Sequence, residues 1–330
     1  MMITVALLRN CQSARRLLIN DVARSNLAPK SLFRSEARST RVQQSESISL
    51  KERILRPTEG TPFVFGKAAL AGGSALGLAS LCYYGLGLSN QAGAIDRAAL
   101  WPEYVKERIR ATFGYFGASV VVAASSAYAA THSPTIMRMA SSGSIWAILG
   151  TMAVLIGVGA VAQSIPYQPG FGSKQLAWLT HSALIGGLMA PLSIFGGPLL
   201  MRAAFITAGV IASLSTVAIC APSEKFLNMG APLAMGFGAV FAATMASLFF
   251  PPTTALGAGL YSISIYGGLL LFSAFMLYDV QKIVRRAEHT PYNSMRPYDP
   301  VSNAMSVFMD TVNIFIRIVQ VLAMNGNRKK

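Results

Sequence analysis

The chain has 330 residues, of which 53% are hydrophobic and only 12% are charged. Soluble globular domains carry about 25% charged residues, so this composition excludes an ordinary soluble domain. Long apolar runs recur along most of the chain and predict an all-α polytopic membrane protein. The formal net charge of +15 is concentrated in the N-terminal segment and in the connections between apolar runs, which argues against nucleic-acid binding.

The N-terminal segment is strongly basic. Its first 41 residues carry eight basic side chains against Asp21 and Glu36, and they are rich in serine. An arginine-rich, serine-rich and acid-poor leader is typical of a mitochondrial transit peptide. We therefore predict that residues 1–55 are a transit peptide or a disordered leader outside the mature fold. A basic tail on a protein of another membrane is the alternative.

The cysteines and histidines are few and scattered. Cys11, Cys82 and Cys220 lie far apart, and the three histidines form no pair at helical spacing. This pattern predicts neither a disulfide framework nor a transition-metal centre. We expect no cofactor, because Ca²⁺ and H⁺ are expected only as transported ions.

Eight segments are long and apolar enough to cross the ~30 Å hydrocarbon core as helices. The first, at about 63–88, precedes a polar link and is predicted to be an extra N-terminal transmembrane helix. A seven-helix membrane core is predicted within 105–330. Its spans are expected at about 109–131, 144–165, 176–196, 199–221, 229–250, 257–284 and 303–324. An even number of spans places both ends on one side, and matrix-side termini are the simplest expectation for an imported protein.

Two aspartates, Asp279 and Asp310, lie inside the last two predicted spans. A charged group within the bilayer costs ~3 kcal/mol on insertion scales, so it normally faces protein or water. One loop joins these two spans, which places both aspartates at a similar depth, roughly 7–11 Å from the same membrane face. The three other acidic residues beyond position 107 are expected in connecting loops; these are Glu224, Glu288 and Asp299.

The last predicted span carries a polar stripe whose members recur at spacings of three and four. They are Asn303, Ser306, Asp310, Asn313 and Arg317. This spacing predicts one polar helix face directed into a bundle, as in a hydrated path or an internal polar network. A purely structural Asp310–Arg317 pair, with Asp279 as a membrane-edge residue near Lys282, is the plainer alternative.

The chemistry of the aspartates suggests a function. Two neighbouring carboxylates in a medium of low dielectric constant share protons and titrate as a unit. Their hard oxygen atoms also suit Ca²⁺. A cation between them displaces the proton, and a proton displaces the cation. We therefore interpret Asp279 and Asp310 as a pH sensor on an ion pathway and as candidate Ca²⁺ ligands.

Two motifs resemble the transmembrane Bax inhibitor motif family. They are LYD at 277–279, which includes Tyr278 and is followed by Gln281, and MDTVNIFIRI at 309–318. YGGLLLFSAFMLYDVQKIVRRAE, YDP at 298–300 and the terminal NRKK are most similar to the mitochondrial branch of this family. The resemblance implies a seven-helix Bax-inhibitor-like bundle plus one helix, in the inner mitochondrial membrane, with its last helix central. It also implies that Asp279 and Asp310 form a di-aspartyl pH sensor.

The resemblance further implies a Ca²⁺ leak or Ca²⁺/H⁺ antiport, with Ca²⁺, H⁺ and inner-membrane lipids as partners. The mitochondrial branch is linked to cristae organisation, retention of cytochrome c, restraint of apoptosis and restraint of a matrix-facing AAA protease. One departure concerns bacterial relatives, in which a basic cluster closing the second core helix tethers an aspartate. At that place this chain has only Lys174.

Two alternative functions remain open at this point. An intramembrane aspartyl protease also needs two aspartates on adjacent helices. However, Asp310 lies in VFMDTVN rather than in Gly-x-Gly-Asp, and no Pro-Ala-Leu triplet follows, so we expect no enzyme. The stronger alternative is a non-transporting scaffold that regulates an inner-membrane protease and cristae, with the basic NRKK tail binding an acidic partner or anionic lipid.

Overall fold

The computed structural model describes residues 61–85, 88–89, 93–140, 145–222, 224–291 and 297–326. The predicted leader, residues 1–55, lies outside this part of the chain. Every regular element among the described residues is a helix, and eight helical segments there are long and apolar enough to span a membrane. The all-α polytopic fold predicted from composition is therefore confirmed.

The helices follow one another in the predicted order. α3 (Thr61–Gly85) is the extra N-terminal span, and the short α4 (Ala94–Ala98) leads into the core. The core comprises α5 (Glu103–Thr131), α6 (Pro134–Ala140), α7 (Ile145–Ser164), α8 (Ser173–Met189), η1 (Ala190–Phe195), α9 (Gly197–Cys220), η2 (Leu227–Met229), α10 (Gly230–Ala246), α11 (Ala255–Ser262), η3 (Ile263–Gly267), α12 (Gly268–His289) and α13 (Pro300–Gly326). η1 and η2 are 3₁₀ turns, whereas η3 is a π-helical turn that joins α11 and α12 into one span.

Two helices extend furthest beyond their predicted spans. α5 begins at Glu103, and α12 continues to His289. The expectation that Glu288 lies in a loop is therefore wrong, because it lies in the last helical turn of α12. Glu288 accepts a 2.7 Å hydrogen bond from Trp101 Nε1 and forms an ion pair with Arg97. These contacts join the polar ends of the helices, which hydropathy does not detect because it reports only the apolar stretch.

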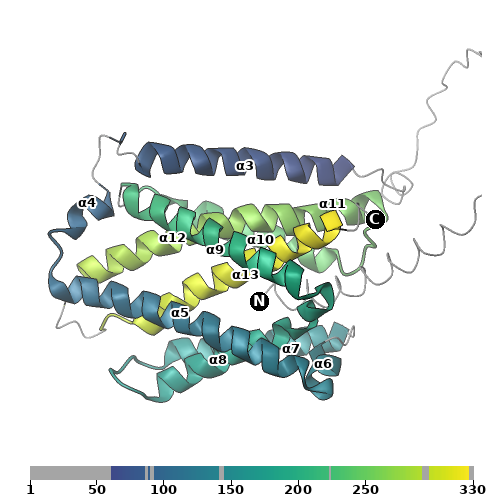
Figure 1. Cartoon of the computed structure of the whole chain (residues 1–330), viewed down its shortest axis with the longest axis horizontal. Coiled ribbons are helices and arrows are strands. Elements are labelled where there is room, and N and C mark those ends of the chain that lie inside the picture. The colour runs from purple at the N-terminus through teal and green to yellow at the C-terminus, as the bar shows by residue number, and fades with distance from the viewer. Residues whose placement is uncertain are drawn as a thin grey trace, which may run out of the picture.

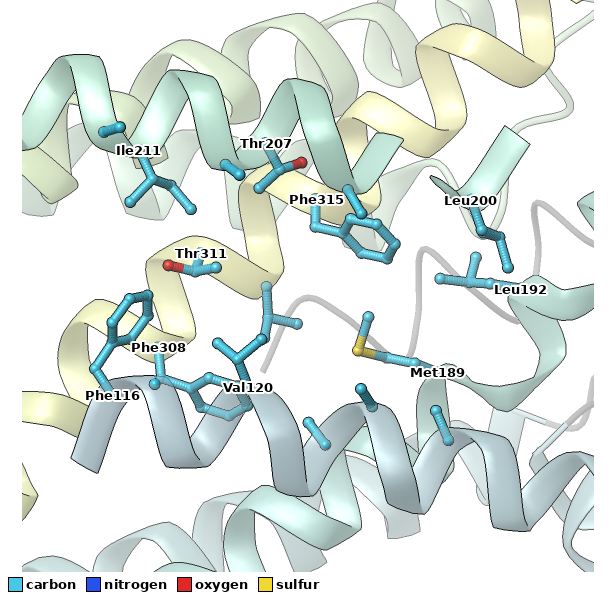
Figure 2. Close-up of a pocket in the computed structure, with 18 of the residues that line it drawn as sticks. Phe116, Val120, Met189, Leu192, Leu200, Thr207, Ile211, Phe308, Thr311 and Phe315 are labelled. Atoms are coloured by element: carbon cyan, nitrogen blue, oxygen red, sulfur yellow. The ribbon is translucent and has the colours of Figure 1, made fainter. Parts of the chain in front are cut away.

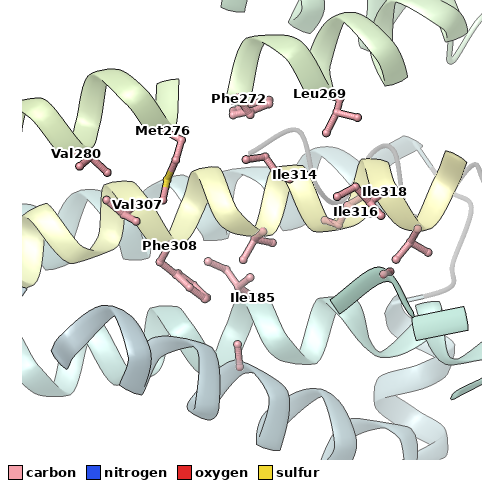
Figure 3. Close-up of a cluster of buried hydrophobic side chains, with 14 of the residues drawn as sticks. Ile185, Leu269, Phe272, Met276, Val280, Val307, Phe308, Ile314, Ile316 and Ile318 are labelled. Carbon is pink, nitrogen blue, oxygen red and sulfur yellow. The ribbon is translucent and has the colours of Figure 1, made fainter. Parts of the chain in front are cut away.

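α13 lies at the centre of the bundle, where it packs against α5, α9 and α12 (Figure 1). It is the most buried of the described spans. Figure 3 shows apolar side chains of α13, including Val307, Phe308 and Ile314, between α12 and the helices that carry Ile185 and its neighbours. Lipid tails are as apolar as these side chains, so close packing rather than transfer out of water holds this core together.

α3 lies on the outside of the bundle and packs against α9, α11 and η3 (Figure 1). It approaches closely through glycines: a Cβ atom on Gly66 would lie 2.2 Å from the Tyr266 ring, and one on Gly73 would lie 2.3 Å from the Leu270 side chain. Its other face exposes large apolar side chains such as Phe65, as expected for a helix that faces lipid.

The two ends of the described chain lie at the same end of the bundle. Lys67 Nζ, near the start of α3, donates a 3.4 Å hydrogen bond to Asn325 near the end of α13. The opposite end, called the hairpin end below, holds the described residues of the α12–α13 connection (290–291 and 297–299), the α7–α8 connection (165–172) and the start of α5. An even number of spans produces this arrangement.

Candidate functional site: a di-aspartyl cavity

Asp279 on α12 and Asp310 on α13 lie together inside the bundle. Both residues are buried, with 9% and 6% of their surface exposed, and both line the same cavity. Asp279 lies ten residues before the end of α12, and Asp310 ten residues after the start of α13. At 1.5 Å per residue, both are about 15 Å from the hairpin end, so the antiparallel pair sets them level.

Asp310 Oδ2 is buried without a hydrogen-bond partner among the described residues. A shared proton supplies a donor and removes one of two adjacent like charges. Lys282 Nζ lies 3.7 Å from Asp279 Oδ1 and opposes the remaining negative charge. The geometry therefore favours a singly protonated pair.

A cavity of about 480 Å³ opens beside the two aspartates. It lies among α7, α8, α10, α12 and α13, and its walls are apolar apart from one polar group of residues. That group comprises Gln163, His181, Asp279, Ser306, Asp310 and Asn313. Carboxylate, hydroxyl and amide oxygen atoms are the ligands that Ca²⁺ prefers.

The cavity provides few charged ligands for a metal ion. Among the residues that the structure describes, no three His, Cys, Asp or Glu side chains lie close enough together to hold one. Ca²⁺ takes six to eight oxygen ligands, so a cation beside Asp279 and Asp310 would keep much of its water shell.

The predicted polar stripe divides into three parts. Ser306, Asp310 and Asn313 line the cavity. Asn303 lies nearer the hairpin end, where its Oδ1 accepts a 2.9 Å hydrogen bond from Arg286 of α12. Arg317 lies two helical turns beyond Asp310, away from the hairpin end. The stripe is therefore a cavity wall in its middle and an anchor at each end.

Arg317 is almost fully buried against the π-helical turn η3. Its Nε donates to the carbonyl oxygen of Ser264 (3.2 Å), and its Nη1 donates to the carbonyl and side-chain oxygens of Asn313 (3.1 and 3.2 Å). The guanidinium also lies 4.8 Å from the centre of the Phe272 ring. Gly268 leaves room for it, because a Cβ atom there would lie 2.1 Å from Nε. Arg317 thus links α13 to the centre of the α11–α12 span.

Tyr278 and Gln281, which neighbour Asp279 in the LYD motif, do not line the cavity. Gln281 Nε2 donates to the carbonyl oxygen of Pro222 (2.9 Å), and its Oε1 accepts from the backbone N–H of Phe226 (2.8 Å). The Tyr278 ring lies beneath Lys282 Nζ, 5.2 Å from its centre. These residues position α12 against the α9–α10 connection.

The relatives of the chain agree with this architecture. Residues 105–327 match the sequence profile of the family described as Inhibitor of apoptosis-promoting Bax1 (Bax1-I). The chain belongs to the Bax inhibitor family. It is 48% identical over 322 residues to the growth hormone-inducible transmembrane protein of Rattus norvegicus, a match that covers 96% of this chain and 93% of that protein.

Similarity to Bax inhibitor 1 proteins is more distant. The chain is 26% identical to Bax inhibitor 1 of Rattus norvegicus over 230 residues, which are 68% of this chain and 89% of that protein. It is 28% identical to Bax inhibitor 1 of Oryza sativa subsp. japonica over 187 residues, which are 55% of this chain and 71% of that protein. The Bax1-I match begins at residue 105, after α3.

Sequence reasoning missed two polar residues of the cavity beside Asp279 and Asp310, namely Gln163 and His181. They come from α7 and α8, more than 90 residues before Asp279, and no short-range spacing connects them to it. His181 is 5% exposed, and its Nδ1 has no hydrogen-bond partner among the described residues. The sequence signal that could have indicated His181 was a single histidine within an apolar span.

The hairpin end holds a further polar contact that the sequence did not predict. Lys174, at the start of α8, is buried, forms an ion pair with Asp299 and donates to the carbonyl oxygen of Ile165 (2.8 Å). Asp299 also accepts a 3.0 Å hydrogen bond from the backbone N–H of Ser302 in the first turn of α13. Burial raises the pKa of the adjacent Tyr298, which keeps its hydroxyl protonated. The start of the central helix is therefore tied to the α7–α8 connection.

Proposed function

We propose that the chain is a pH-sensitive Ca²⁺ channel or Ca²⁺/H⁺ exchanger of the inner mitochondrial membrane, with Asp279 and Asp310 as its sensor. The main support is that two buried carboxyl groups lie in the wall of one polar cavity, inside a bundle of membrane-spanning helices. Such groups are costly in lipid and typically mark ion pathways.

The proposed cycle follows from charge. When both carboxyl groups are protonated, the cavity presents no negative charge and holds a cation poorly. Loss of one proton leaves the shared-proton state, and a divalent cation that enters beside the pair displaces the remaining proton. Ion passage should therefore increase as pH rises at the cavity. The positive charge of Lys282 partly neutralises Asp279 and so weakens the attraction of the two aspartates for a cation.

Support for the ion and the membrane comes from the sequence. The basic, serine-rich leader is typical of mitochondrial import. The motifs around Asp279 and Asp310 resemble the mitochondrial branch of the Bax inhibitor family, for which Ca²⁺/H⁺ exchange is expected. The links to cristae organisation, cytochrome c, apoptosis and an AAA protease belong to the same proposal and rest on the same resemblance.

Ca²⁺ flux from proteoliposomes tests the proposal. We expect wild-type flux to rise with pH, and Asp310→Asn to lose both the pH dependence and at least about tenfold of the flux at neutral pH. A unit charge ~4 Å from a cation contributes about 4 kcal/mol at an effective dielectric constant of ~20, which is ample for a tenfold effect. We expect the same losses of flux and of pH dependence for Asp279→Asn. Glu224→Gln, which removes an exposed carboxylate, is the matched control.

Equal flux from wild type and Asp310→Asn would overturn the transport mechanism. That outcome would favour the alternative, a non-transporting scaffold that organises cristae or restrains a protease. Restoration of cristae shape in deficient cells by both forms would then assign the cellular role to the scaffold.

A further inference from the structure

A second and larger cavity, of about 670 Å³, lies between α13, α5 and α9 (Figure 2). Its walls are α5 and α9, and Phe308, Thr311 and Phe315 of α13 form its floor. At 100° per residue, these floor residues lie on the far side of the helix from Asp310 and Asn313. α13 therefore separates a polar cavity from an apolar one.

Small residues on both walls create this space. α5 contributes Gly117 and Ala124, and α9 contributes Ala204, Ala208 and Ala212 at intervals of four residues. The wall formed by α5 runs from residue 113 to residue 127, which corresponds to about 21 Å along the helix axis. The cavity is thus a long groove parallel to the membrane-spanning helices.

The groove lining offers little to a polar ligand. The hydroxyl of Thr207 donates to the carbonyl oxygen of Ala203 (2.7 Å), and that of Thr311 donates to the carbonyl oxygen of Val307 (2.8 Å). Both threonine hydroxyls therefore donate within their own helices, and the rest of the lining is apolar apart from Ser215. Empty apolar cavities of this kind stay dry and take up apolar ligands.

The size and shape of the groove indicate its occupant. Its volume of 670 Å³ falls within the ~300–1,000 Å³ typical of small-molecule sites. A single flexible chain fits this long and narrow shape.

A positive charge lies in line with the groove at one end. Arg110 is exposed and precedes the groove residues Phe113 and Gly117 by three and seven positions, so it continues the same face of α5. Residues 111–131 carry no charged side chain, which places Arg110 at the membrane interface. A guanidinium there matches the geometry of a phosphate group.

From these observations we propose that the groove binds one acyl chain of a phospholipid from the surrounding bilayer, with the phosphate of that lipid at Arg110. The chain packs against the face of α13 that lies behind Asp310. Lipid binding at this place does not depend on cation transport, and each can be tested without the other.

Photo-crosslinking of the full chain in phosphatidylcholine nanodiscs tests the site. The probe is phosphatidylglycerol with a diazirine in the middle of one acyl chain, and labelled residues are mapped by mass spectrometry. On the groove floor, Thr311 is 9% exposed and Phe315 is partly exposed, so a chain in the groove can reach them. We expect these α13 residues to be labelled.

Matched variants locate the label in the groove. Ala208→Trp fills the groove and should reduce α13 labelling about tenfold, a loss of ~1.4 kcal/mol in binding. Phe205→Trp changes a side chain on α9 that is 72% exposed and lies outside the groove, so it should leave the labelling unchanged. Ala124→Leu narrows the groove from α5 and gives a second reading if Ala208→Trp fails to fold.

A diacylglycerol with the same diazirine chain separates chain binding from phosphate binding. Arg110→Gln should reduce α13 labelling by the phospholipid to the diacylglycerol level and leave diacylglycerol labelling unchanged. Label confined to outward residues such as Phe205 would overturn the proposal. Equal α13 labelling in wild type, Ala208→Trp and Ala124→Leu would overturn it too, as would crosslinks that show a second copy of the chain in the groove.

Discussion

At the scale of single residues, Arg317 shows how the bundle accommodates a buried charge. A guanidinium inside a membrane protein needs polar partners, and here these are the oxygens of Ser264 and Asn313. The Phe272 ring lies against its plane. The absence of a side chain at Gly268 provides the space. The choice of glycine at this position is therefore explained by the arginine opposite it.

Gly268→Ala should destabilise the protein by about 1–3 kcal/mol, because the new methyl group overlaps Arg317 Nε in a packed core. Thermal unfolding of the purified protein in detergent measures the effect. Gly259→Ala, in α11 of the same span, is the matched control because a Cβ atom there meets nothing within 4 Å. Replacement of a helical glycine by alanine then stabilises by ~0.5–1 kcal/mol. Equal effects of the two changes would contradict this account of Gly268.

At the scale of elements, the α12–α13 hairpin determines the candidate site. Its two helices hold Asp279 and Asp310 level, and Lys174 ties the start of α13 to the α7–α8 connection through Asp299. Lys174 is buried, whereas Asp299 is partly exposed. Loss of the aspartate would leave a buried ammonium group whose remaining contact includes the Ile165 carbonyl.

Asp299→Asn keeps an oxygen that can cap α13 but removes the charge opposite Lys174. We expect a loss of roughly 2–3 kcal/mol, less than the ~3–5 kcal/mol of a fully buried pair. Faster hydrogen exchange in the first turn of α13 should accompany it. Glu224→Gln breaks the exposed pair with Arg285 and should cost less than about 1 kcal/mol. A loss for Asp299→Asn as small as that of the control would show that the Lys174 pair does not hold the hairpin.

The sequence predicted the spans and the level placement of the two aspartates because hydropathy and helix geometry are local properties. It also predicted the stripe from Asn303 to Arg317, because a spacing of three or four residues defines one helix face. It could not place His181 in the same cavity, nor Lys174 beside Asp299. Those contacts join segments more than 90 residues apart, and they depend on how whole helices pack.

At the scale of the whole molecule, the position of the chain ends has a consequence for topology. The start of α3 and the end of α13 lie at one end of the bundle, and the α7–α8 connection lies at the other. If the termini face the matrix, as proposed for an imported protein, the hairpin end faces the intermembrane space. The candidate cavity is then nearer the more acidic side of an energised membrane.

Cysteine labelling in mitochondria without their outer membrane checks this orientation. In a chain with Cys11, Cys82 and Cys220 replaced by serine, Gln168→Cys in the α7–α8 connection should react with a membrane-impermeant maleimide. A cysteine added at the C-terminus should react only after detergent is added. The reverse pattern would show the opposite orientation and would place the hairpin end in the matrix.

The π-helical turn η3 bears on how the chain tolerates changes in length. A π turn holds one residue more than an α turn, and the surplus is absorbed locally, so the helix faces on either side keep their phase. Deletion of one residue within 263–267 should therefore leave Asp279 facing Asp310, although it removes the Ser264 carbonyl from Arg317. Deletion of one residue from 269–278 would instead rotate Asp279 by about 100° relative to α11. The number of residues in α12 is therefore fixed by the position of Asp279, whereas η3 can lose one residue without rotating the helices on either side of it.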